Sequence, residues 1–140
     1  MGKKVKVVFD TNVWLSIFMK KALSQDFSNI MRKEATVYVT EEILAEISRA
    51  LQYPRIIDVT EASGIGSREI LRAIAANSKM VEPKMKIHIV EDDPEDNKIL
   101  EAAATAGAGI IVTGDKHLLR LGKFRKTRIL APREFLDSIS

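Results

Sequence analysis

The chain has 140 residues, of which 46% are hydrophobic and 29% charged, and its formal net charge is +3. This balance excludes a disordered chain, and because no stretch approaches the roughly 18 apolar residues of a membrane span, we expect one cytoplasmic domain over residues 1–140 with no membrane contact. The absence of cysteine excludes disulfides, thiolate zinc sites and a cysteine nucleophile, which leaves oxygen atoms and the two histidines as ligands for a metal.

The first part of the chain alternates β-rich runs with helical patterns. Residues 4–9 predict a strand, and residues 13–33 follow as a helical stretch. Residues 36–39 predict a second strand. Residues 41–51 then show helical periodicity, with Thr40 as a plausible N-cap.

The middle of the chain is less regular. Pro54 ends the preceding helical pattern, and residues 55–66 favour no regular element. Residues 67–77 are helical again. Residues 86–90 alternate polar and apolar side chains, which predicts an edge strand.

The last part of the chain returns to the alternation of helices and strands. Asp93 predicts the N-cap of a helix over residues 94–106, with proline at its first position. Residues 110–112 are fully apolar, as in a buried parallel strand. A strand at residues 128–130 and a helix from Pro132 complete the pattern.

Strands separated by helices imply right-handed crossovers and a mostly parallel sheet covered on both faces, so the predicted fold is a three-layer α/β/α sandwich. Ligands of such sheets bind beyond the carboxyl ends of the strands. Asp10 directly follows the first predicted strand, and Asp115 follows the strand at residues 110–112 after Thr113 and Gly114. We therefore expect both carboxylates at one edge of the sheet.

Two predicted helices offer further carboxylates near their apolar faces. Asp96 lies within about 60 degrees of the apolar stripe of its helix, and Glu46 lies at the margin of the stripe of its own helix. The alternative for Asp96 is a role in capping or in the helix dipole, and we prefer that interpretation for Asp93 and Glu95. The alternative for Glu46 is an ordinary boundary residue.

Convergence of these four acids would be costly without compensation. Two carboxylates about 4 Å apart repel by roughly 4 kcal/mol at an effective dielectric constant near 20. Several such pairs rival the whole stability of a domain, about 5 to 15 kcal/mol. A cluster of this kind therefore needs raised pKa values or a bound cation. Hard oxygen ligands favour Mg²⁺ or Mn²⁺ over zinc or copper.

Several segments resemble the motifs of PIN domains, a family named after the PilT N-terminus. The four matching segments are FDTN at 9–12, TEEILAEI at 40–47, DPEDNKILEAA at 93–103 and IVTGDKHLL at 111–119. RILAPREFL at 128–136 resembles the end of one subgroup, often described as the toxin components (VapC-like) of toxin-antitoxin pairs. The resemblance covers nearly the whole chain, with the motifs in the family's order.

This resemblance implies a metal-dependent endoribonuclease that hydrolyses RNA phosphodiester bonds, with an antitoxin protein as partner and a homodimeric assembly. The acidic quartet that it implies is Asp10, Glu46, Asp96 and Asp115. Residues at positions that support the site by hydrogen bonding are Thr11, Asn12 and Thr113. A further acid that is frequent in the family falls here on His117, which leaves the number of bound metal ions open.

Phosphodiester hydrolysis needs an activated water, neutralised phosphate charge and a stabilised leaving oxygen, which one or two Mg²⁺ or Mn²⁺ ions can supply. Our hypothesis is that three aspartates hold the metal, namely Asp10, Asp96 and Asp115. Glu46 would then orient or deprotonate the attacking water. Three cations close in sequence to the acids are candidates for contacts with the RNA backbone, with plain surface as the alternative: Lys98, Lys116 and Arg120.

Two other functions fit parts of the pattern. A phosphatase of the haloacid-dehalogenase type also has an aspartate after its first strand, but it needs a second one where Asn12 stands and an acid where Leu119 and Arg120 stand. A catalytically inactive module that binds RNA or a protein partner would keep the fold without the chemistry. Neither histidine is assigned a catalytic role, since His117 is expected to form hydrogen bonds at the surface and His88 to face the side of its strand opposite Ile87 and Ile89.

Overall fold

The computed structural model describes residues 4–20, 25–30, 34–90 and 94–139. Within these ranges the chain forms one sheet of six strands in the order β3-β2-β1-β4-β6-β5. Neighbouring strands are parallel except β5, which is antiparallel to β6. The strands are β1 (Val5–Phe9), β2 (Ala35–Val39), β3 (Lys79–Met80), β4 (Ile110–Val112), β5 (Lys123–Phe124) and β6 (Thr127–Leu130).

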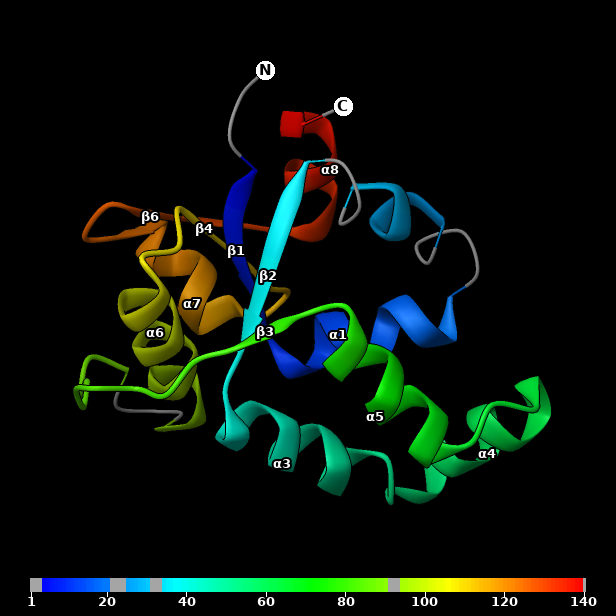
Figure 1. The fold of residues 1–140 in the computed structure, drawn as a ribbon. Helices are drawn as coiled ribbons and strands as arrows, with labels where there is room; N and C mark the ends of the chain where they lie inside the picture. The colour runs from blue at the N-terminus through cyan, green and yellow to red at the C-terminus, as the bar shows by residue number, and fades with distance from the viewer. Residues whose placement is uncertain (1–3, 21–24, 31–33, 91–93, 140) are drawn as a thin grey trace.

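Helices cover both faces of the sheet, with α6 and α7 on one side of the strands and α1 and α8 on the other (Figure 1). The helices are α1 (Thr11–Met19), α3 (Glu41–Ala50), α4 (Pro54–Ser63), α5 (Ser67–Ala76), α6 (Pro94–Ala106), α7 (Lys116–Leu121) and α8 (Pro132–Ile139). Residues 25–30 are helical as well. The prediction of a three-layer sandwich around a mostly parallel sheet is therefore confirmed.

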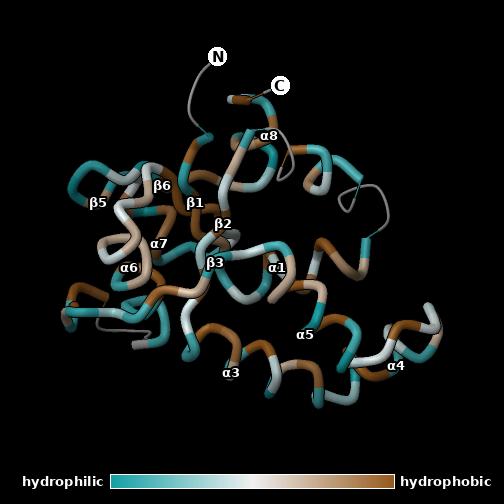
Figure 2. The backbone as a smooth tube through the Cα atoms, in the orientation of Figure 1, coloured by the Kyte–Doolittle hydropathy of each residue, from teal (hydrophilic) through white to brown (hydrophobic). Residues whose placement is uncertain are grey.

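Side chains of β1 are buried on both faces of the sheet. Phe9 packs edge-on against Trp14, Phe27 and Phe135, with ring centroids 5.1, 5.3 and 6.0 Å apart. The other face is covered by α6, which contacts β1, β2 and β4. Figure 2 shows hydrophobic colours along β1 and hydrophilic colours around the hairpin at β5. Burial of this aromatic cluster fixes where β1 ends, and with it the position of residue 10.

Helices α1 and α3 begin directly after neighbouring parallel strands, each with a side chain as its N-cap. The Thr40 hydroxyl accepts a hydrogen bond of 3.1 Å from the amide of Ile43, as predicted. Asp10 caps α1 in the same way, through a bond of 2.9 Å from the amide of Val13. The two strand-to-helix turns therefore lie side by side at the carboxyl edge of the sheet.

The prediction of an irregular segment at residues 55–66 is wrong. Pro54 does not merely end a helical pattern, because it is the first residue of α4, where proline is favourable. Ile56 and Thr60 lie one turn apart on the buried side of this helix. Gly64, with a φ of 76°, ends it in the left-handed conformation.

The prediction of an edge strand at residues 86–90 is also wrong, since the third strand is β3 and pairs with the end of β2. Side chains of α6 form hydrogen bonds with the backbone amides and one carbonyl of residues 87–90. The amide of Ile87 donates to Glu101, 2.9 Å away. Asn97 accepts from the amides of Ile89 and Val90 at 3.0 and 2.9 Å and donates to the Val90 carbonyl at 2.8 Å. These bonds replace a ladder of strand pairing.

The other predicted elements agree closely with the structure, except that the helix predicted to begin at residue 13 begins at Thr11 and ends at Met19. Of the predicted helix at 13–33, residues 13–19 lie in α1 and residues 25–30 are helical, whereas 21–24 and 31–33 lie outside the described residues. The predicted N-cap Asp93 also lies outside them. The short elements α7 and β5 were not predicted. No helix in the described ranges combines the length and the apolar character needed to cross a membrane.

Candidate functional site

A polar pocket of about 180 Å³ opens beyond the carboxyl ends of β1 and β4. Its lining consists of Asp10, Thr11, Asn12, Glu46, Glu95, Asp96, Ile99 and Asp115. All four acids of the predicted quartet line this pocket, although they come from two strand ends and two helices. Glu95 is a fifth carboxylate in the lining among the described residues.

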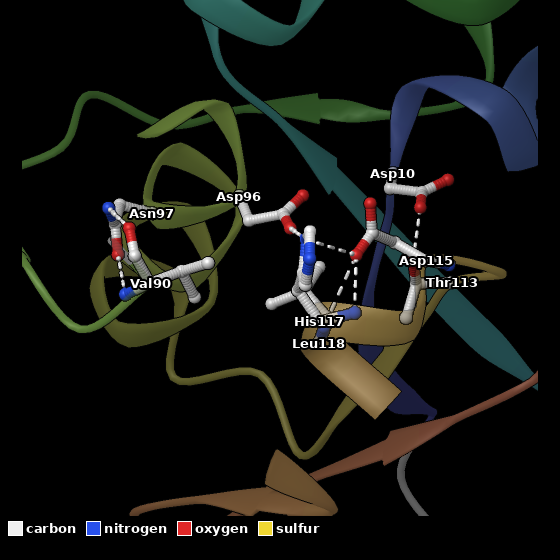
Figure 3. Close-up of polar contacts among 8 residues, drawn as sticks. All are labelled: Asp10, Val90, Asp96, Asn97, Thr113, Asp115, His117 and Leu118. Atoms are coloured by element: carbon white, nitrogen blue, oxygen red, sulfur yellow. Dashed lines mark hydrogen bonds and ion pairs between the residues drawn. The ribbon is translucent and has the colours of Figure 1, made fainter. Parts of the chain in front are cut away.

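Asp10 is held in place by both of its carboxylate oxygens. Oδ1 accepts the bond from the amide of Val13 that caps α1, and Oδ2 accepts a hydrogen bond from the hydroxyl of Thr113 (Figure 3). The side chain is only 7% exposed. Burial raises the pKa of Asp10, and the charge of Asp115 raises it further, against the lowering effect of its hydrogen bonds. The carboxylate is thus well placed, but its charge is unfavourable.

Thr113 links the two strand ends. The residue directly follows β4 and is fully buried. While its hydroxyl donates to Asp10, the same oxygen accepts a hydrogen bond of 2.9 Å from the amide of Asp115. One buried side chain therefore sets the positions of two acids that are more than a hundred residues apart in the chain.

Asp96, Asp115 and His117 bring three ligand atoms together. Asp96 is 6% exposed on the first turn of α6, and Asp115 is the N-cap of α7, where its Oδ1 accepts from the amide of His117 at 2.7 Å. Nδ1 of His117 lies 3.9 Å from Oδ2 of Asp96 and 3.6 Å from Oδ1 of Asp115 (Figure 3). These distances exceed those of hydrogen bonds. One ligand atom from each residue lies within 4.8 Å of the others, which is the spacing of a cation site.

Glu46 and Glu95 are the two glutamates of the pocket lining, and they lie close enough to interact. Burial raises the pKa of Glu46, and the neighbouring Glu95 charge raises it further, whereas the Thr11 hydroxyl lowers it. Glu95 also meets a cation, because Nζ of Lys98 lies 3.5 Å from its Oε1. A raised pKa and a cation site are the two ways to relieve crowded carboxylates, and this pocket shows signs of both. Oxygen-rich ligands with one imidazole fit a hard divalent cation.

Two supporting candidates line this pocket, and the RNA-binding candidates lie on α6 and α7, the helices that carry or follow its acids. Thr11 is buried in its wall, and Asn12 is exposed at its rim. Lys116 and Arg120 are exposed on α7, one turn apart, directly after Asp115. Lys98 contacts Glu95, so part of its charge is already used within the protein.

Two residues of the site were missed by the reasoning from sequence. Glu95 was assigned to capping, although its spacing of four residues from Ile99 places both on one side of α6, and both line the pocket. His117 was expected at the surface, whereas its ring faces two aspartates. The signal for His117 was its place at a position where the PIN motif often has an acid.

Fold and pocket together define a class, namely α/β proteins with an acidic pocket at the carboxyl edge of a parallel sheet. The PIN domain family model matches residues 6–117, so the chain belongs to the PIN domain family. Members of this family are generally nucleases that need a divalent metal.

Comparison with solved structures supports the same fold. The crystal structure of PAE2754 from Pyrobaculum aerophilum is similar with a TM-score of 0.59 and 17% sequence identity, over 96% of this chain and 94% of that chain. At this identity the similarity shows the fold alone. No curated protein matches the chain.

Proposed function

We propose that this chain is a metal-dependent endoribonuclease, which hydrolyses RNA phosphodiester bonds with Mg²⁺ or Mn²⁺ and is the toxin of a toxin-antitoxin pair. The observation that carries the proposal is the meeting of Asp10, Glu46, Asp96 and Asp115 in one pocket of about 180 Å³. Family membership supports the nuclease chemistry, and the resemblance of residues 128–136 to the toxin subgroup supports the biological role.

Asp10, Asp96 and Asp115 are the proposed metal ligands, and His117 joins them because its Nδ1 faces the last two. A bound Mg²⁺ or Mn²⁺ ion supplies Lewis-acid activation of water and neutralises phosphate charge. Thr113 holds Asp10 and Asp115 in fixed positions relative to each other through its two hydrogen bonds. Thr11 and Asn12 complete the wall between α1 and the acids.

Glu46 is the proposed group that orients or deprotonates the attacking water. Its pKa is raised by burial and by Glu95, and a carboxylate with a raised pKa is a stronger base near neutral pH. Glu46 belongs to α3 and lines the same pocket as the aspartates that follow the strands. A water held in this pocket would therefore lie in one cavity with both the proposed base and the proposed metal ligands.

An RNA substrate is favoured by the charge of residues 116–133, which include seven cations and no acid. All seven are exposed: Lys116, Arg120, Lys123, Arg125, Lys126, Arg128 and Arg133. Cations that contact phosphates release counterions on binding, which favours a polyanion over a neutral substrate. We propose that Lys116 and Arg120, together with Lys98, contact the backbone next to the cleaved bond.

The test is cleavage of a mixed-sequence panel of single-stranded RNA, with matched DNA, in Mg²⁺, in Mn²⁺ and in chelator. We expect cleavage of RNA with either metal and none in chelator. The variant Asp10→Asn should be inactive, whereas the control Asp58→Asn, on the exposed side of α4, should behave as the parent protein. A folded parent protein that cuts no RNA with either metal, or an Asp10→Asn variant that still cuts, would contradict the proposal.

Two further assays separate the alternatives. A chromogenic phosphate ester tests the phosphatase, which family membership disfavours. An inactive module would retain RNA in a binding assay without cutting it.

The toxin role predicts that expression of the parent protein arrests bacterial growth and that expression of Asp10→Asn does not. The proposed homodimer is tested by sedimentation.

A further inference from the structure

A second cleft of about 330 Å³ lies beside the acidic pocket at the start of α1. Its lining consists of Asn12, Val13, Ser16, Ile17, Lys20, Phe27, Gly114, Pro132, Arg133 and Leu136. Asn12 belongs to both cavities, and Gly114 directly precedes Asp115. The two cavities therefore adjoin at Asn12.

The interior of this cleft is mostly apolar, whereas its neighbour is acidic. Val13, Ile17, Phe27 and Leu136 form an apolar wall contributed by α1, by the helical residues 25–30 and by α8. Asn12 and Ser16 add a few hydrogen-bonding groups. An apolar cavity with a small number of polar groups is typical of a site for an organic ligand with a flat apolar body.

Two exposed cationic residues line this cleft. Lys20 follows the last turn of α1, and Arg133 lies in the first turn of α8. Neither is within 4 Å of a carboxylate in the part of the chain that the structure describes. The acid next to Arg133 is already engaged, because Glu134 accepts a hydrogen bond of 3.0 Å from the amide of Ala131. The cleft thus presents positive charge to a ligand.

We propose that this cleft binds one base of single-stranded RNA next to the cleaved bond, while Lys20 and Arg133 contact the adjoining phosphate. The proposal rests on the proposed nuclease function and adds a subsite for the substrate. Bases of single-stranded RNA are unstacked and expose flat apolar faces together with hydrogen-bonding edges. The apolar wall fits the base, Asn12 and Ser16 lie where they can contact its edge, and the two cations complement the phosphate.

The experiment measures the affinity of a short labelled single-stranded RNA by fluorescence anisotropy, in an Asp10→Asn background that leaves the RNA uncut. Each nucleotide is replaced in turn by an abasic one. We expect one position at which loss of the base weakens binding by about tenfold, because a stacked base contributes that order of affinity. In the variant Ser16→Phe, which fills the cleft, the intact RNA should bind about tenfold more weakly and the abasic replacement should cost nothing further.

Ser48→Phe is the matched control, since Ser48 is exposed on α3 and lines none of these cavities. This control should keep both the affinity and the abasic profile of the parent protein. An abasic profile without a sensitive position, or a Ser16→Phe protein with an unchanged profile, would overturn the proposal. That second result is also what a cleft for a peptide partner would give.

Arg133→Ala gives a test that does not depend on filling the cleft. Because Arg133 is exposed, its loss should leave the fold intact, lower RNA affinity several-fold and reduce the slope of affinity against salt by about one contact. The control Arg68→Ala, on the exposed side of α5, should change neither quantity. If the parent protein cuts RNA but Arg133→Ala and Ser16→Phe leave KM for RNA unchanged, the cleft proposal fails and the nuclease stands. If base-dependent binding at this cleft occurs without any cleavage by the parent protein, the nuclease fails and the cleft stands only as a base-binding site, without its placement beside a cleaved bond.

Discussion

The turns that begin α1 and α3 solve one structural problem in two ways. Both follow neighbouring parallel strands, and both cap a helix with a buried side chain, Asp10 in one and Thr40 in the other. Thr40 satisfies the amide of Ile43 without any charge. Asp10 does the same for Val13 but introduces a carboxylate whose pKa is raised by burial and by Asp115. Since a neutral cap is available, the charged cap is better explained by function than by folding.

The largest expected effect breaks this comparison at Asp10. Asn caps a helix about as well as Asp, so Asp10→Asn should keep the turn while removing a charge from the proposed metal site. We expect metal-dependent RNA cleavage to fall by at least about a hundredfold, because a proposed metal ligand is lost. In chelator, the melting temperature should rise. Cleavage rates and thermal melts check the two expectations, and a variant with unchanged cleavage and an unchanged melting temperature in chelator would show that Asp10 is only a cap.

His117 should give the next largest effect, on metal affinity. The ring faces Asp96 and Asp115 at 3.9 and 3.6 Å, so His117→Ala should weaken Mn²⁺ binding by about tenfold or more. His88→Ala is a matched control, because His88 is the other histidine of the chain and is exposed in the segment before α6. Titration calorimetry with Mn²⁺ measures both variants. Equal affinities would remove His117 from the ligand set.

The pH dependence of stability should also distinguish the charged cap from the neutral one. Folding raises the pKa of Asp10 and Glu46, so the folded protein binds protons more tightly than the unfolded chain. The stabilisation from these groups is complete below the ordinary carboxyl pKa of about 4 and is lost as pH rises through the raised values. In chelator, the melting temperature should therefore contain a component that declines from about pH 4 toward neutral. Asp10→Asn should make this decline shallower, and an unchanged slope would contradict the assigned cause.

Thr40→Ala should show the cost of a neutral cap alone. Loss of an N-cap hydroxyl destabilises a helix by about 1 kcal/mol. Thr40→Ser is the control, because both variants lose the buried methyl group but Thr40→Ser keeps the capping hydroxyl. We expect a lower melting temperature for Thr40→Ala at every pH, with metal affinity unchanged. Chemical denaturation measures the free energy of unfolding. A loss of Mn²⁺ affinity as well would mean that the α3 turn also shapes the acidic pocket.

Much of the fold and of this pocket follows from patterns that the sequence displays locally. The β-rich run at residues 4–9 and the apolar run at residues 110–112 predict parallel strands, and the rule that such strands present their carboxyl ends at one edge brings Asp10 and Asp115 together. The position of Asp96 on the apolar stripe of its helix predicts that it points inward, and the structure shows it buried. These inferences hold because each depends on periodicity or on topology.

What could not be predicted depends on contacts between distant side chains. The alternating residues 86–90 have the pattern of a strand, but their amides bond to Asn97 and Glu101 of α6 instead of to a neighbouring strand. The inward orientation of His117 depends on where α6 places Asp96. Neither side-chain arrangement leaves a periodic signal, so only the folded structure reveals it.

The smallest expected effect concerns a carboxylate of the same pocket that has a cation nearby. Nζ of Lys98 lies 3.5 Å from Oε1 of Glu95, and both side chains are more than a third exposed. Solvent screens such a pair, so Lys98→Ala should change the free energy of unfolding by less than about 0.5 kcal/mol. If Lys98 also contacts the RNA backbone, KM should rise several-fold while kcat stays near that of the parent protein. A large loss of stability would mean that this ion pair relieves the repulsion between the acids of the pocket. The difference between Glu95, which has a lysine nearby, and Asp10, which is held by hydrogen bonds, would then be smaller than their exposures indicate.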